Sequence, residues 1–106
     1  MAECLKKLAF ISQPMKGKTA EAIRKERKRL EDMLVLNGYK VVDSVFEDFP
    51  NAEQDYRNVS LAYLAKSLDL LAKCDGAAFA SGWANARGCR IEHDCCREYG
   101  IDILVD

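Results

Sequence analysis

The sequence predicts an α/β fold: a three-layer, Rossmann- or flavodoxin-like domain with a four-stranded parallel sheet in the order 2-1-3-4. Short apolar segments alternate with longer segments of helical periodicity, from an apolar segment near the start to another at the end. Such alternation is typical of parallel strands joined by right-handed helical crossovers. A length of 106 residues supports one hydrophobic core, so we expect a single domain over residues 1–106.

The first half of the chain supplies two strands and a helix. Residues 5–11 (LKKLAFI) end in an apolar run and indicate a buried strand. A loop over residues 12–18 contains proline and glycine, and the helix that follows is expected over residues 19–37 with Gly38 as its stop. Residues 39–42 (YKVV) indicate the second strand. The helix is expected to face inward with Ala20, Ile23, Leu30, Met33 and Leu34.

The second half begins with a polar stretch over residues 43–58, which is long for a connection and typical of a lid or binding loop. A helix is expected over residues 59–73, a strand over residues 75–80, another helix up to Gly100, and a last strand over residues 101–105. The first of these helices is expected to point inward with Leu61, Leu64, Ala65, Leu68, Leu71 and Ala72.

Composition excludes several classes of function. Hydrophobic residues make up 49% of the chain and charged residues 31%, and the net charge of -1 argues against a nucleic-acid partner. No apolar run is long enough for a membrane span, and no signal peptide is recognisable, so we expect a cytoplasmic protein without a membrane partner. The basic run over residues 24–29 is interleaved with acids, which favours an ion-paired helix face. Reduced thiols without a metal are expected at Cys4, Cys74, Cys89, Cys95 and Cys96.

The last helix carries one acid on its apolar face. We expect it to begin between Asn85 and Arg87, with Asn85 as its cap, and to end at Gly100. Steps of about 100° per residue place Glu92 inside the apolar arc, His93 at its border, and Arg90, Asp94, Arg97 and Glu98 opposite. The other members of the arc are Ile91, Cys95, Gly88, Tyr99, Cys96 and Cys89. A buried carboxylate is costly unless it is paired or reaches a wet pocket.

Glu92 has two interpretations. Gly88, one turn earlier, leaves bare backbone beside it, so a ligand can approach there. The alternative is that Glu92 only pairs with an arginine. Ligands of parallel sheets bind beyond the carboxyl ends of the strands, where the strand order reverses. The loops at residues 12–17 and 81–87 should meet there, and Trp83 in the second loop either stacks on a base or sugar or fills a dimer contact.

Two other motifs suggest a phosphate site and a zinc site. Gly17-Lys18-Thr19 is similar to the end of a phosphate-binding P-loop, but Ser12 stands where that motif needs a glycine. A weaker version remains, in which Ser12, Gln13 and the helix start hold one phosphate or hydroxyl group. The spacing of Cys89, His93 and Cys96 suits zinc, but no second ligand pair has matching spacing, which favours buried thiols and an outward histidine.

Three segments resemble a known family. FISQPMKGKT, CDGAAFASGW and ARGCRIEHDCCREYGI resemble small proteins related to nucleoside 2-deoxyribosyltransferases, above all a phage- and prophage-associated branch of unassigned function. The resemblance covers nearly the whole chain in the same order. It implies that Glu92 is a nucleophile at the sugar C1′, that Gly88 is the glycine of the same motif, and that the loop of Ser12, Gln13, Pro14, Met15 and Gly17 binds substrate. The chain departs from the family pattern at Ala86, where an aspartate or serine is usual, and at Phe10, where a tyrosine is common.

The expected function is therefore cleavage or transfer of the N-glycosidic bond of a nucleoside or nucleotide through Glu92, without a cofactor. The alternatives are a non-catalytic nucleotide or nucleotide-sugar binding module of phage origin and a purely structural partner protein. The expected partners are a small-molecule nucleoside or nucleotide and a second copy of the chain, because four strands and three helices leave apolar surface uncovered and the related enzymes complete their sites with a neighbouring subunit.

Overall fold

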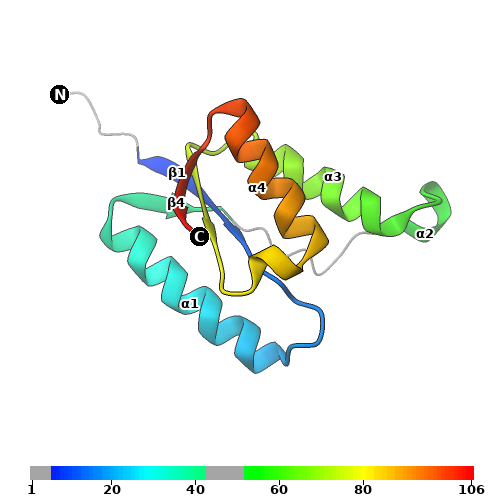
Figure 1. Cartoon of the computed structure of the whole chain (residues 1–106), viewed down its shortest axis with the longest axis horizontal. Coiled ribbons are helices and arrows are strands. Elements are labelled where there is room, and N and C mark those ends of the chain that lie inside the picture. Colours follow the sequence, from blue (N-terminus) through cyan, green and yellow to red (C-terminus); the bar gives the residue numbers. More distant parts are fainter. Residues whose placement is uncertain (1–5, 43–51) are drawn as a thin grey trace.

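The computed structural model describes residues 6–42 and 52–106 and confirms the predicted fold class. Within these residues four parallel strands form one sheet in the order β2-β1-β3-β4 (Figure 1). The strands are β1 (Lys7–Ser12), β2 (Tyr39–Val41), β3 (Gly76–Phe79) and β4 (Asp102–Val105). Each begins or ends within two residues of its predicted bounds, and the predicted strand residue Leu5 lies outside the described residues.

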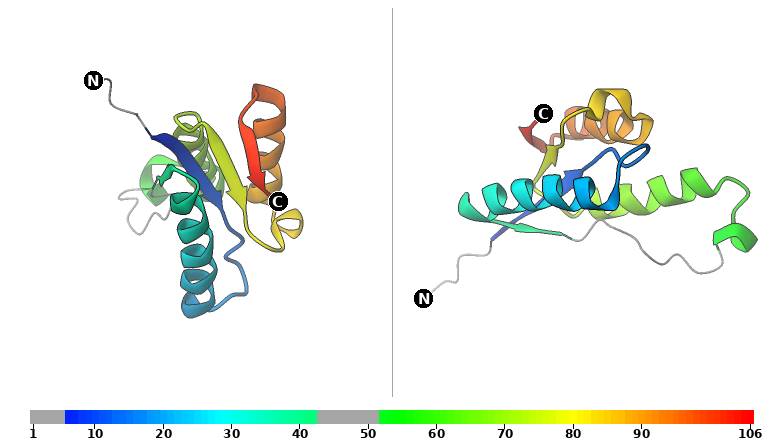
Figure 2. Two further views of the ribbon diagram at one scale, coloured as in Figure 1. Left: turned by 90° about the vertical axis from the view of Figure 1, so that its left-hand side faces the viewer. Right: turned by 90° about the horizontal axis from the view of Figure 1, so that it is seen from below.

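The helices form the two outer layers. Figure 2 shows α1 on one side of the strands and α4 on the other. The helices of the described ranges are α1 (Ala20–Leu36), α2 (Ala52–Asp55), α3 (Val59–Leu71), α4 (Arg87–Tyr99) and the short 3₁₀ helix η1 (Trp83–Asn85). The sequence did not predict α2 or η1, since both are too short for a periodic pattern to emerge. Residues 43–51 of the predicted long connection lie outside the described ranges.

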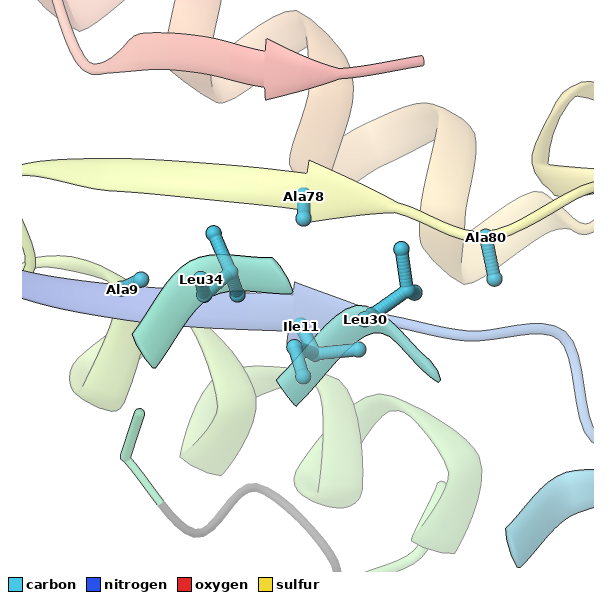
Figure 3. Close-up of a cluster of buried hydrophobic side chains, with 6 residues drawn as sticks. All are labelled: Ala9, Ile11, Leu30, Leu34, Ala78 and Ala80. Carbon is cyan, nitrogen blue, oxygen red and sulfur yellow. The ribbon is translucent and has the colours of Figure 1, made fainter. Parts of the chain in front are cut away.

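One face of the sheet packs against α1. Alternate residues of β1 and β3 turn to this face, as the period of a strand requires, and Leu30 and Leu34 of α1 cover them (Figure 3). The strand residues are Ala9, Ile11, Ala78 and, directly after β3, Ala80. Thr19 caps α1, because its hydroxyl accepts a hydrogen bond from the Ala22 amide. Ala20 is exposed, contrary to the predicted inward stripe, since the first turn of α1 extends past the core residues of the sheet.

The other face packs against α4 and the C-terminal part of α3. Phe10, Ala77 and Phe79 of the strands meet Leu71 of α3 and Cys96 of α4. The predicted inward stripe of α3 was wrong in part, because the buried residues are Ala62 and Leu71, whereas Leu61 is 59% exposed and Ala65 and Ala72 are also exposed.

The physical reason is that the leucines of α3 that pack against the core of the sheet all lie in its C-terminal part, at Leu68, Leu70 and Leu71. In Figure 1 the N-terminal part of α3 extends away from the sheet toward α2. A prediction that one stripe of α3 faces the core along the whole helix therefore buries residues that are in fact exposed, such as Leu61.

The two ends of α4 differ from each other. Gly100 ends the helix in the left-handed conformation (φ 73°), and its amide donates to the Cys96 carbonyl, as predicted. The start was predicted less well: Asn85 belongs to η1, and the N-cap is Ala86, whose side chain makes no cap hydrogen bond. Tyr99, placed on the apolar arc, is 82% exposed, because it lies in the last turn, beyond the core contacts of Cys96. None of the helices in the described ranges has both the length and the apolar character of a membrane span.

Candidate functional site

A cavity of about 730 Å³ opens beside the carboxyl end of β1. Its walls come from three elements: the end of β1 with the loop after it, the N-terminal part of α3, and the first two turns of α4. This is the sheet edge at which α/β proteins bind ligands. Polar side chains in the lining are Ser12, Gln13, Asn58, Ser60, Tyr63, Ser67, Arg87, Cys89 and Glu92.

Glu92 lies in the wall of this cavity and is 7% exposed. The buried Ser12 hydroxyl donates a 2.6 Å hydrogen bond to Glu92 Oε1. Burial raises the pKa of the Glu92 carboxyl above its ordinary value, and the Ser12 hydrogen bond partly opposes that rise. Among the described residues no arginine or lysine forms an ion pair with Glu92. The interpretation of Glu92 as a simple partner of an arginine therefore has no support in this geometry.

Cys89 lies close to Ser12 and to Glu92, and it was not among the predicted site residues. It is 5% exposed and lines the cavity one turn before Glu92. Burial raises the pKa of its thiol, the nearby Ser12 hydroxyl lowers it, and the charge of Glu92 raises it again. The thiol is therefore protonated at neutral pH and is a weak nucleophile there. Glu92 is the stronger candidate for an attacking group.

Four of the predicted binding residues reach the cavity besides Glu92: Ser12, Gln13, Met15 and Gly88. A Cβ atom built on Gly88 meets nothing within 4 Å, so the space expected beside this glycine exists. The Gln13 amide donates through Nε2 to the Ile23 carbonyl at 2.6 Å. Its Oε1 is a buried acceptor without a hydrogen-bond partner in the part of the chain that the structure describes.

Three predicted binding residues do not line the cavity. Pro14 is buried and Gly17 turns the loop with a φ of 79°, and neither contributes to the wall. Trp83, expected at the mouth, instead stacks on His93 with ring centroids 4.0 Å apart and planes 11° from parallel. Of the predicted loop over residues 81–87, only Arg87 lines the cavity, and Arg87 is the first residue of α4.

His93 also differs from its prediction. It was placed at the border of the apolar arc and expected outward, but it is only 9% exposed. Trp83 covers its ring, Phe79 meets it edge-on with centroids 4.9 Å apart, and its Nε2 lies 3.2 Å from Asp106 Oδ2. These partners hold the ring away from Cys89, so the zinc set of Cys89, His93 and Cys96 does not converge. Within residues 6–42 and 52–106 no group of three such ligands does, and the absence of a metal stays a prediction.

Sequence reasoning missed the wall that α3 supplies. Ser60, Tyr63 and Ser67 stand at i, i+3 and i+7 and share one side of α3 with Leu64. This polar stripe was the available signal, but the leucines of α3 suggested a helix that is buried along its whole length. A stripe of hydroxyl groups on an otherwise apolar helix is a sign of a cavity wall.

Comparison with known proteins adds one finding. No curated protein and no solved structure matches the chain. The sequence profile of one family, described as Domain of unknown function (DUF4406), matches residues 7–105, which is nearly the whole chain and all of the sheet. The chain belongs to this family.

Proposed function

We propose that the protein cleaves or transfers the N-glycosidic bond of a nucleoside or nucleotide, with Glu92 as the nucleophile. The observation that carries the proposal is a buried carboxylate in the wall of an open cavity, without an ion-pair partner in the described ranges and oriented by the Ser12 hydroxyl. The resemblance to nucleoside 2-deoxyribosyltransferases supports the same residue. A membership in DUF4406 is compatible with it but names no activity.

The chemistry uses the two carboxylate oxygens differently. Ser12 donates to Oε1, which leaves Oε2 as the attacking oxygen. Oε2 forms a bond to C1′ of the sugar while the bond from C1′ to the base nitrogen breaks, and the base leaves with that electron pair and takes up a proton. Water or a second base then attacks C1′ while the bond from C1′ to Oε2 breaks and its electron pair returns to the Glu92 carboxylate. The attacking group gives up a proton, and the product is the free sugar or a new nucleoside. Burial removes competing water from the carboxylate and so favours the first step.

The second candidate is a non-catalytic module that binds a nucleotide or nucleotide-sugar. Ala86 and Phe10 favour it, since an acid or hydroxyl at the first position and a phenol at the second are usual in the transferases. In that case the cavity holds its ligand through Ser12, Gln13 and the hydroxyl groups of α3, and Glu92 contributes affinity only.

The experiment is incubation of the protein with a panel of nucleosides and nucleotides, with chromatographic detection of free base. The parent protein should release base from at least one member, and Glu92→Gln should lower that rate by several orders of magnitude with little change in binding. Glu98→Gln is the matched control, because Glu98 is exposed on the same helix. Unchanged turnover in Glu92→Gln contradicts the proposal, and ligand binding without base release by the parent favours the binding module.

A cytoplasmic homodimer is part of the same proposal. Met15, Leu61 and Ile91 lie at the cavity and are 43%, 59% and 36% exposed, which gives the mouth an apolar rim for a second copy. The unpaired thiols of Cys74, Cys89, Cys95 and Cys96 fit a reducing compartment. Light scattering at high protein concentration should give twice the mass of one chain, and Leu61→Lys should return the mass to that of one chain.

A further inference from the structure

A second, smaller cavity of about 390 Å³ adjoins the first on the outer side of α4. It is lined by the stacked pair of Trp83 and His93 and by a row of charged α4 residues. The row consists of Arg87, Arg90, Asp94 and Arg97. Neither the candidate nucleophile nor the polar wall of α3 takes part in it.

The row has a regular spacing. Its members stand at i, i+3, i+7 and i+10, so they share one face of α4 and extend over about 15 Å of helix at about 1.5 Å per residue. Three guanidinium groups and one carboxylate give this face a formal charge of +2. In the described part of the chain none of the three arginines is in an ion pair, and Arg90 donates to the Ala84 carbonyl at 3.0 Å. The face therefore offers unneutralised positive charge in a protein whose net charge is -1.

Arg87 connects the two cavities, since it lines both of them together with Ile91. A ligand that fills the Glu92 cavity can thus continue past Arg87 onto the arginine row. Arg87, Arg90 and Arg97 are exposed, so their attraction for an anion should be weakened by salt. A guanidinium fork matches two oxygens of one phosphate group, so three arginines in a row suit a chain of phosphates.

We propose that the second cavity is a polyphosphate subsite, and that the ligand of the protein is a nucleoside diphosphate or triphosphate rather than a nucleoside. The phosphates lie along Arg87, Arg90 and Arg97, and the sugar and base lie in the Glu92 cavity. This inference rests on the proposed function for the nucleoside half of the ligand. The polyphosphate half rests on the charges and the spacing of α4 alone.

The test is calorimetric titration of the parent protein with inorganic tripolyphosphate, and of Glu92→Gln with deoxyadenosine and with its 5′-triphosphate. The triphosphate should bind at least about tenfold more tightly than the nucleoside, and added salt should weaken that preference. Arg87→Gln and Arg97→Gln should each reduce the affinity for tripolyphosphate about tenfold or more. Arg24→Gln is the matched control, since Arg24 is exposed on α1 and lines neither cavity, and its affinity should equal that of the parent.

Equal affinity for nucleoside and triphosphate, or an unchanged tripolyphosphate affinity in Arg97→Gln, overturns the inference. These experiments distinguish failure of the polyphosphate subsite from failure of the proposed glycosidic reaction. If Glu92 is required for base release but the triphosphate binds no more tightly than the nucleoside, only the subsite is wrong. If no base is released but tripolyphosphate binding depends on Arg87 and Arg97, the subsite is supported and the catalytic proposal fails.

Discussion

Ser12 and Glu92 are 80 residues apart in the sequence, and the hydroxyl of the first donates a 2.6 Å hydrogen bond to the carboxylate of the second. Both side chains are buried, at 2% and 7% exposed. The bond joins the end of β1 to the second turn of α4, so it fixes the direction of the carboxylate relative to the cavity. A hydrogen bond to a buried carboxylate also favours the ionised form, which is the form that attacks carbon.

Replacing Ser12 by alanine should raise the pKa of Glu92 further, because the hydrogen bond that stabilises the charged form is lost while burial stays. The acidic limb of the kcat/KM profile should therefore move to higher pH. Loss of a bond to a charged group should also lower the free energy of unfolding at neutral pH by about 1.5–3 kcal/mol. Ser60→Ala is the control, since Ser60 lines the same cavity whereas the hydroxyl that donates to Glu92 is that of Ser12. An equal pH shift in Ser60→Ala contradicts the assignment.

Glu92→Gln should stabilise the protein at neutral pH. The folded-state pKa of Glu92 is raised, so the folded state loses stability relative to the unfolded chain as pH rises through that pKa. A neutral amide avoids this loss. The advantage of Glu92→Gln should therefore be greatest at pH 7–8 and should vanish below the ordinary glutamate pKa of about 4.3. Urea unfolding of both proteins from pH 4 to pH 8 measures it, with the exposed Glu98→Gln as control. A less stable Glu92→Gln at neutral pH indicates that the carboxylate braces the fold.

Gly88→Ala should separate stability from binding. Gly88 lies in the first turn of α4 and does not have a positive φ, so alanine should stabilise the helix by up to about 1 kcal/mol. The added methyl group enters open space beside Glu92 and should weaken nucleoside binding, and Gly88→Val should weaken it more. Thermal unfolding and calorimetry measure the two effects. Gly100→Ala is the opposite case: its φ of 73° predicts a loss of stability without a change in binding, and equal behaviour of the two glycines contradicts this account.

Gly76→Ala should destabilise the sheet. A Cβ atom on Gly76 of β3 would lie 2.8 Å from Leu104 Cδ1 and 2.9 Å from Leu104 Cγ, so the leucine must move. Overpacking of this kind costs about 1–3 kcal/mol. Leu104→Ala should relieve the clash, so the double variant should lose less stability than the two single variants together. Denaturant titrations measure the free energy of unfolding of the three variants. If the losses of the two single variants add up to that of the double variant, the two side chains do not compete for the same space.

The fold was predictable because its signals are local. The alternation of apolar segments and helices sets the layers, and Gly38 and Gly100 mark helix ends without any knowledge of tertiary contacts. Glu92 was found in the same way, as an acid out of phase with the polar face of its helix. Trp83 and His93 were misplaced because their positions depend on each other and on Phe79, three side chains that meet only after the chain has folded. The contribution of α3 to the cavity wall was missed because the sequence of a helix does not show which of its turns pack on the sheet and which extend beyond it.

The extension of α3 beyond the sheet divides that helix between two roles. Leu68 and Leu71, near its C-terminal end, hold it on the core, whereas Ser60, Tyr63 and Ser67 face the cavity. Substitutions in the first group change the fold, and substitutions in the second change what the cavity accepts. A protein built in this way can diverge in ligand choice along one half of a helix while the other half keeps the domain intact, so the serines and the tyrosine of α3 are where members of the family that bind different ligands should differ first.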